Sequence, residues 1–139
     1  MAKKKQVLVI HSEIDFILFG LASHAKDYRL CFDLNKILDI HLTKNEDLEF
    51  KNKQQESSFF SVFSYLNEDE YTMMVIANKT LGQHLIPELK QWDYFFMIKG
   101  MMRDPEKLKT LEKVKTSKLI ALAADIDPSK IKSIENLFF

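Results

Sequence analysis

One stretch of the chain decides the fold, the run Asp93-Tyr94-Phe95-Phe96-Met97-Ile98-Lys99. The inner residues of this run are all apolar or aromatic, so a strand built from them would bury both of its faces. We therefore expect residues 93–99 to form a central strand. Next, Asp104-Pro105-Glu106 predicts the start of a helix, because Asp104 can accept from first-turn amides and proline is tolerated at the first helical position. Its expected buried side consists of Leu108, Leu111 and Val114.

Two alternating stretches precede this strand. Residues 59–66 and 71–78 both place apolar side chains at every second position, and the polar turn 67–70 joins them. This pattern predicts an antiparallel hairpin. Further toward the N-terminus, residues 14–21 are apolar on both alternating faces, which predicts another strand that is covered on both sides. This strand could begin as early as Val7.

Residues 23–40 carry helical periodicity. Apolar residues recur at the spacing of one helix face, namely Leu30, Cys31, Leu34, Ile37 and Leu38. We expect Tyr28 and Phe32 to widen this stripe, Ser23 to cap the helix, and the helix to be deeply buried. The other expected elements are an edge strand at 48–51, a strand at 118–124 and a short helix opened by Asp127-Pro128.

The predicted order of elements is that of an α+β protein. With 139 residues and 46% hydrophobic content, the chain suits one globular domain spanning residues 1–139. We expect a mixed, mostly antiparallel sheet, two main helices on one face and a short C-terminal helix.

Composition excludes several classes of protein. The 20 Lys and Arg balance the 20 Asp and Glu, which weighs against a general nucleic-acid binder. Cys31 is the single cysteine, so no intramolecular disulfide forms, and the apolar run 7–10 is too short for a signal peptide or membrane span. We therefore expect a cytoplasmic protein with no membrane association. A basic segment at 99–118, with seven basic against three acidic residues, is either a solvated helix face or a phosphate-binding patch.

The sequence lacks the common motifs of catalysis. Isolated glycines form neither a P-loop nor a dinucleotide fingerprint, and the four histidines lie in different predicted elements without metal-ligand spacing. We expect no cofactor and no metal.

The most distinctive segment surrounds Pro87. Proline favours a bend that leads into the central strand, with the Glu88 carboxylate facing free backbone N–H groups, Asp93 binding loop amides and Tyr94 donating its hydroxyl. An alternative, catalytic interpretation pairs Glu88 with Asp93 and takes Tyr94 or His84 as proton donor.

This segment resembles the signature of a bacterial family named IPExxxVDY. Here it reads Ile86-Pro87-Glu88, three residues, then Trp92-Asp93-Tyr94, with Trp92 in place of the valine. Flanking stretches also resemble that family, from 26–30 and Leu34-Asn35-Lys36 to the ending 135–139, so the resemblance covers nearly the whole chain. It implies a small bacterial protein with no assigned reaction, and no catalytic residue is carried over.

Three functional hypotheses remain open. The leading one is a non-enzymatic interaction or adaptor protein, or a small homo-oligomer, with a protein partner or a second copy contacting Phe59, Phe63, Tyr65, Met101 and Met102. The same five residues could instead belong to the core. The second is a small-ligand binder or enzyme with a pocket near Glu88, Asp93, Tyr94, Asp27 and Arg29. The third places RNA on the basic segment, although the charge balance disfavours nucleic acid.

Overall fold

Strand β9 (Tyr94–Lys99) lies inside a six-stranded sheet. In the computed structural model, which describes residues 15–67 and 71–139, the strand order is β10-β1-β9-β6-β5-β2 and every pairing is antiparallel. The other strands are β1 (Phe16–Ala22), β2 (Thr43–Lys44), β5 (Val62–Leu66), β6 (Thr72–Ala77) and β10 (Leu122–Ile126). The sequence prediction of a central strand at 93–99 is therefore confirmed.

The apolar run of β9 supplies both faces of the sheet. Tyr94, Phe96 and Ile98 enter one hydrophobic cluster, whereas Phe95 and Met97 enter a second cluster on the opposite face. Successive side chains of a strand point to opposite sides, so only a continuous apolar run can serve two cores.

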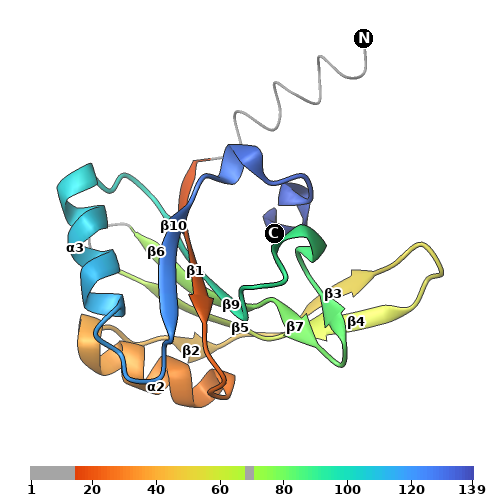
Figure 1. Cartoon of the computed structure of the whole chain (residues 1–139), viewed down its shortest axis with the longest axis horizontal. Coiled ribbons are helices and arrows are strands. Elements are labelled where there is room, and N and C mark those ends of the chain that lie inside the picture. Colours follow the sequence, from red (N-terminus) through yellow and green to blue (C-terminus); the bar gives the residue numbers. More distant parts are fainter. Residues whose placement is uncertain (1–14, 68–70) are drawn as a thin grey trace, which may run out of the picture.

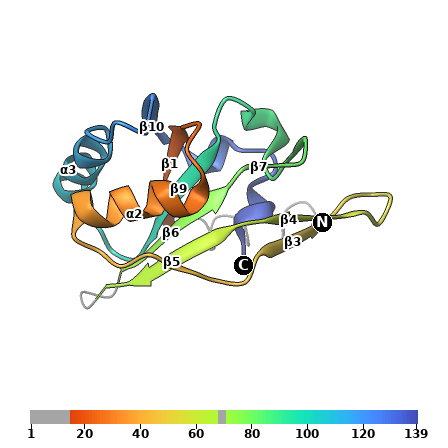
Figure 2. The same cartoon turned by 90° about the horizontal axis from the view of Figure 1, so that it is seen from below.

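Helices α2 (Asp27–Leu38) and α3 (Asp104–Val114) cover one face of the sheet (Figure 2). α2 begins at Asp27, later than predicted, and its N-cap residue is Lys26. Ser23 is therefore no helix cap; its hydroxyl accepts from the N–H of Ala25 at 3.1 Å and donates to the carbonyl of Leu119 at 2.6 Å. Asp104 is likewise the first residue of α3 and not its cap.

The opposite face is covered by short elements. The β3 (Leu48–Lys51) and β4 (Ser57–Phe60) strands form a separate hairpin that projects from the main sheet (Figure 1). A second small pair is β7 (Lys79–Thr80) with β8 (Gln83–His84), and three short 3₁₀ turns complete this side: η1 (Pro87–Leu89), η2 (Pro128–Lys130) and η3 (Ile134–Leu137).

The α+β class is confirmed, with four corrections of detail. No described strand pair is parallel, so the mixed part of the expected sheet does not occur there. The strand expected at 118–124 lies at Leu122–Ile126, because residues 117–120 form a turn in which the N–H of Ile120 donates a hydrogen bond to the carbonyl of Ser117. The strand at 48–51 pairs outside the main sheet, and the expected terminal helix is two 3₁₀ turns.

Some predictions fall outside the described residues, namely a strand start at Val7 and most of the turn 67–70. Within the described part of the chain, no helix has the length and apolarity needed to cross a bilayer.

Candidate functional site

The Pro87 bend is organised by a buried asparagine. Asn78 is fully buried, and its side-chain amide donates to the carbonyls of Leu89 at 3.0 Å and Trp92 at 2.9 Å while its oxygen accepts from the N–H of Ile86 at 2.8 Å. Its backbone also bonds to Leu85 and Asp93. Buried polar groups require such partners, so Asn78 holds both ends of the bend together. Sequence reasoning missed this residue, because nothing in its neighbours marks it as buried.

The polar residues of the bend also bind other segments. The Glu88 carboxylate accepts from the N–H of Ser133 at 2.7 Å. The Asp93 carboxylate accepts from the N–H of Ser23 at 2.7 Å and pairs with the Lys79 ammonium at 2.8 Å. The Tyr94 hydroxyl donates to the carbonyl of Ala25 at 2.7 Å.

Two pKa shifts agree with these structural roles. Burial, followed by the charge of Asp27, raises the pKa of Tyr94 to about 12, so its hydroxyl stays protonated. Partial desolvation favours a higher pKa for Glu88, but hydrogen bonds from the backbone at Glu88 and Ser133 outweigh it and hold this pKa below its usual range.

The Glu88 and Asp93 carboxylates do not share a hydrogen-bond partner. Glu88 binds the C-terminal segment at Ser133, whereas Asp93 binds the β1–α2 connection at Ser23. His84 lies on β8, and burial followed by Lys79 and Lys90 lowers its pKa. Of the other proposed ligand-binding residues, Asp27 accepts from the N–H of Tyr28 at 2.6 Å. Arg29 lines a cleft beside α2.

Comparison with known proteins adds no identity to this site. No family model matches the chain. No curated protein matches it either. The resemblance to IPExxxVDY proteins therefore stays a prediction.

The five residues predicted to contact a partner have different environments. Met101 is 91% exposed and Phe59 is 53% exposed, so both are open to contact. Tyr65 and Met102 are half-buried. Phe63 is buried in the helix-side cluster, so for this residue the core alternative is correct.

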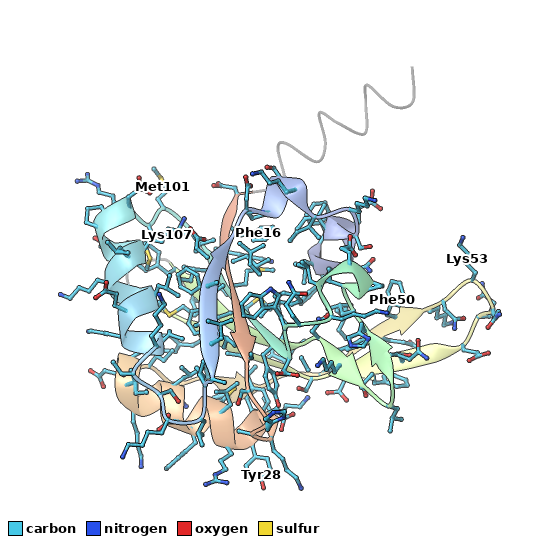
Figure 3. The ribbon with its side chains drawn as sticks, viewed as in Figure 1. Phe16, Tyr28, Phe50, Lys53, Met101 and Lys107 are labelled. Atoms are coloured by element: carbon cyan, nitrogen blue, oxygen red, sulfur yellow. The ribbon has the colours of Figure 1, made fainter. Side chains whose placement is uncertain are left out.

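The main departure from the sequence prediction lies on α2. Tyr28 and Phe32 are 62% and 60% exposed, although we expected both in the core. Figure 3 places Tyr28 at the outer rim of the molecule, far from Met101. The buried stripe of α2 contains only Leu30, Cys31 and Leu34.

A cleft of about 490 Å³ borders this exposed face. We call it the α2 cleft; its lining residues are Arg29, Phe32, Asp33, Ile37, Thr116, Ser117, Lys118 and Leu119. The Ser117 hydroxyl donates to the Asp33 carboxylate across it, and the Lys36 ammonium lies 4.4 Å from the centre of the Phe32 ring.

Helix geometry offers a signal that could have found this face. At 3.6 residues per turn, Phe32 and Leu34 lie on nearly opposite sides of a helix, so both cannot face the sheet. Leu108, which we also expect to be buried, is 60% exposed on α3 while Leu111 and Val114 are buried, and the three-residue spacing of Leu108 and Leu111 gives no signal of this difference.

Metal chemistry finds no support in the described residues. Among residues 15–67 and 71–139, no group of three His, Cys, Asp or Glu side chains is placed to hold an ion. Cys31 is buried, and burial raises its pKa to about 12, which makes the thiol a poor nucleophile or metal ligand in the folded protein.

Proposed function

We propose that this protein is a non-enzymatic interaction protein of the cytoplasm, an adaptor or small homo-oligomer, that contacts its partner through the outer face of α2. The observation that carries the proposal is the exposure of two aromatic side chains one helical turn apart, Tyr28 and Phe32, of which Phe32 lines the α2 cleft. Aromatic residues are enriched where proteins bind other proteins, because they contribute large contact areas with few rotatable bonds.

The contrast between α2 and an ordinary solvated helix face supports the same proposal. A solvated helix face normally consists of charged and polar residues, as on the exposed side of an amphipathic helix. On α2, two aromatic rings share the exposed side with Arg29 and Lys36, and a cleft adjoins this side. The cost of leaving two large rings in water is compensated when a partner covers them.

The ligand-binding or enzyme alternative near Pro87 has less support. Its polar groups Glu88, Asp93 and Tyr94 each bind a backbone group of a distant segment, which accounts for their positions without a ligand. The alternative predicts that Glu88→Gln and Asp93→Asn abolish retention of a small molecule by the purified protein. If these variants change only stability, as we expect, a structural role explains them.

The RNA alternative is tested by salt. Phosphate contacts make binding fall steeply as salt concentration rises, so generic RNA should bind at low salt if the basic segment serves this role. We expect no binding, because the 20 Lys and Arg of the chain are balanced by 20 Asp and Glu.

Photo-crosslinking tests the main proposal. A photoreactive amino acid is placed at position 32 in the full chain, produced in cells of the native host and irradiated. Position 108 is a matched control, since Leu108 is also 60% exposed on a helix. We expect one discrete protein adduct from position 32 and none from position 108. No adduct at position 32, or the same adduct from both positions, would contradict the proposal.

A further inference from the structure

The α2 cleft has a net positive charge, because the single acid of its lining, Asp33, faces two basic residues. Arg29 and Lys118 line it, and Lys36 lies over Phe32 at its edge. Within the described ranges three ion pairs occur, Lys44–Asp47, Lys79–Asp93 and Lys107–Asp125, and none includes these three cations. The one acid in the lining, Asp33, accepts from the Ser117 hydroxyl.

Apolar side chains line the cleft together with these charges. Phe32 is more than half exposed, and Ile37 and Leu119 are partly buried in the same lining. A volume of about 490 Å³ is within the usual range of binding clefts and accommodates one or two side chains of a peptide. The cleft therefore offers an apolar surface bordered by cations from two elements, α2 and the α3–β10 loop.

One contact favours a peptide over a nucleic acid. RNA-binding proteins stack unpaired bases on open aromatic faces. Here the Lys36 ammonium covers a face of the Phe32 ring at 4.4 Å, which blocks stacking on that side. An aliphatic or aromatic side chain can still contact the rest of the ring from within the cleft.

We infer that the α2 cleft binds a protein segment in which an apolar side chain is flanked by carboxylates. The inference rests on the proposed function and names the chemistry of the partner. The apolar side chain contacts Phe32 and Ile37, and the carboxylates pair with Arg29 and Lys118 on either side. Arginine suits this role, because its planar guanidinium binds a carboxylate through two parallel hydrogen bonds.

Peptide selection on the full-length protein tests this chemistry. A displayed library of random 12-residue peptides is selected against the wild type, and the most enriched peptide is labelled with fluorescein for anisotropy titrations. We expect enriched peptides to combine Asp or Glu with a neighbouring Leu, Ile, Phe or Trp. Binding should weaken at least tenfold for Arg29→Glu and for Phe32→Ala, weaken less for Arg29→Lys, and fall as salt concentration rises.

Two matched variants control for the general effects of reversing a surface charge and of removing an exposed apolar side chain. Lys109→Glu reverses an exposed charge on α3, and Leu108→Ala removes a side chain as exposed as Phe32; neither residue lines the cleft. Both should bind the peptide as the wild type does. Circular dichroism of each variant verifies that it is folded.

The outcomes separate this inference from the proposed function. Peptides without acidic residues, an affinity indifferent to Arg29→Glu, or no enrichment at all would overturn the inference. The inference would also be overturned if no peptide binds while a uridine 12-mer does bind and Arg29→Glu abolishes this RNA binding. If position 32 still crosslinks to a protein in these cases, the interaction function stands and only the partner's chemistry is wrong. Absence of that crosslink removes the function itself.

Discussion

The Pro87 bend and the α2 cleft use their side chains in opposite ways. At the bend, Asn78, Glu88, Asp93 and Tyr94 all form hydrogen bonds within the protein. At the cleft, the Arg29 guanidinium has no ion-pair partner among the described residues, and the Phe32 ring is open to water. The bend thus stabilises the fold, whereas the cleft retains groups that a partner could use.

This difference shows why a dense polar motif is a poor guide to a site. The bend joins three segments far apart in sequence, and its backbone must leave regular hydrogen bonding at proline. Buried backbone groups need partners, so polar side chains gather where the chain turns inside the fold. A function-bearing surface has the reverse property, namely groups whose interactions within the chain are incomplete.

The largest effect should come from Asn78→Ala. This change leaves the carbonyls of Leu89 and Trp92 and the N–H of Ile86 without their partner inside the protein. We expect a loss of about 3–5 kcal/mol in the free energy of unfolding, measured by urea denaturation. Asn136→Ala removes one side-chain bond to Leu85 and should cost less. Equal losses would contradict the central role given to Asn78.

Gly20→Ala should be the next most damaging change. A Cβ at Gly20 would lie 2.3 Å from the Trp92 ring and 2.8 Å from the Ile126 side chain. Because Trp92 is buried, overpacking should cost about 3 kcal/mol in the free energy of unfolding.

A double-mutant cycle tests the cause of this loss. Trp92→Val removes the ring atoms that the new Cβ would meet. In that background Gly20→Ala should cost only about 1 kcal/mol, because the contact with the Ile126 side chain remains, so the two changes are strongly coupled. An additive result would mean that the clash with Trp92 is not the cause.

Alkaline pH should weaken the hydrogen bond that joins Tyr94 to the β1–α2 connection at Ala25. The pKa of Tyr94 is raised to about 12 in the folded protein, against 10.0 ordinarily, so the folded state retains this proton longer. The resulting stability is fully present below pH 10 and is lost as pH rises through 12, by about 2 kcal/mol. Guanidinium unfolding between pH 8 and 11.5 measures it. Tyr94→Phe should reduce the dependence of the free energy of unfolding on pH. An unchanged slope would mean that other groups cause this dependence.

A smaller effect is expected for Glu88→Gln. The lowered pKa of Glu88 means that its stabilising contribution is present above pH 4.5 and is lost as pH falls through the lowered value. Glu88 is exposed, so we expect a loss of only about 0.5–1 kcal/mol at pH 7. In urea titrations, the free energies of unfolding of wild type and variant should differ at pH 7 and should agree at pH 3. Glu135→Gln, exposed in the same region, is the control.

The smallest effect on stability should come from the cleft. Phe32→Ala removes an exposed ring from a helix and introduces the residue with the highest helix propensity. Its free energy of unfolding should stay within about 0.5 kcal/mol of the wild type by thermal denaturation, and Leu108→Ala should behave alike. A loss above 2 kcal/mol would show that Phe32 belongs to the core and would remove the contrast with the bend.

Several elements could be predicted from the sequence because they depend on local rules. The apolar run 94–98 reads as a doubly covered strand, and Pro105 marks the start of α3, as observed. At the bend, Tyr94 donates its hydroxyl as predicted, to the carbonyl of Ala25, whereas Asp93 accepts from the N–H of Ser23, 70 residues away, and not from a neighbouring loop amide. The partner of Glu88 could not be predicted, since Ser133 lies 45 residues away.

The candidate site was the least predictable part. Arg29 could be named as a polar residue near the start of the first helix, but the residues that complete the cleft come from 116–119, which we expected to include the start of a strand. Tyr28 and Phe32 were assigned to the core on hydrophobicity alone. Their outward orientation follows from helix geometry once Leu30, Cys31 and Leu34 face the sheet.

Local patterns in the sequence were enough to predict the α+β class, the central strand and the helix that follows it. These features depend on side-chain periodicity and on proline, which act over a few residues. Tertiary contacts alone place Asn78 inside the bend, Trp92 against Gly20, and Phe32 at a cleft with a net positive charge. Each of these depends on contacts between segments far apart in the chain, and no local pattern records which distant residue will be the neighbour.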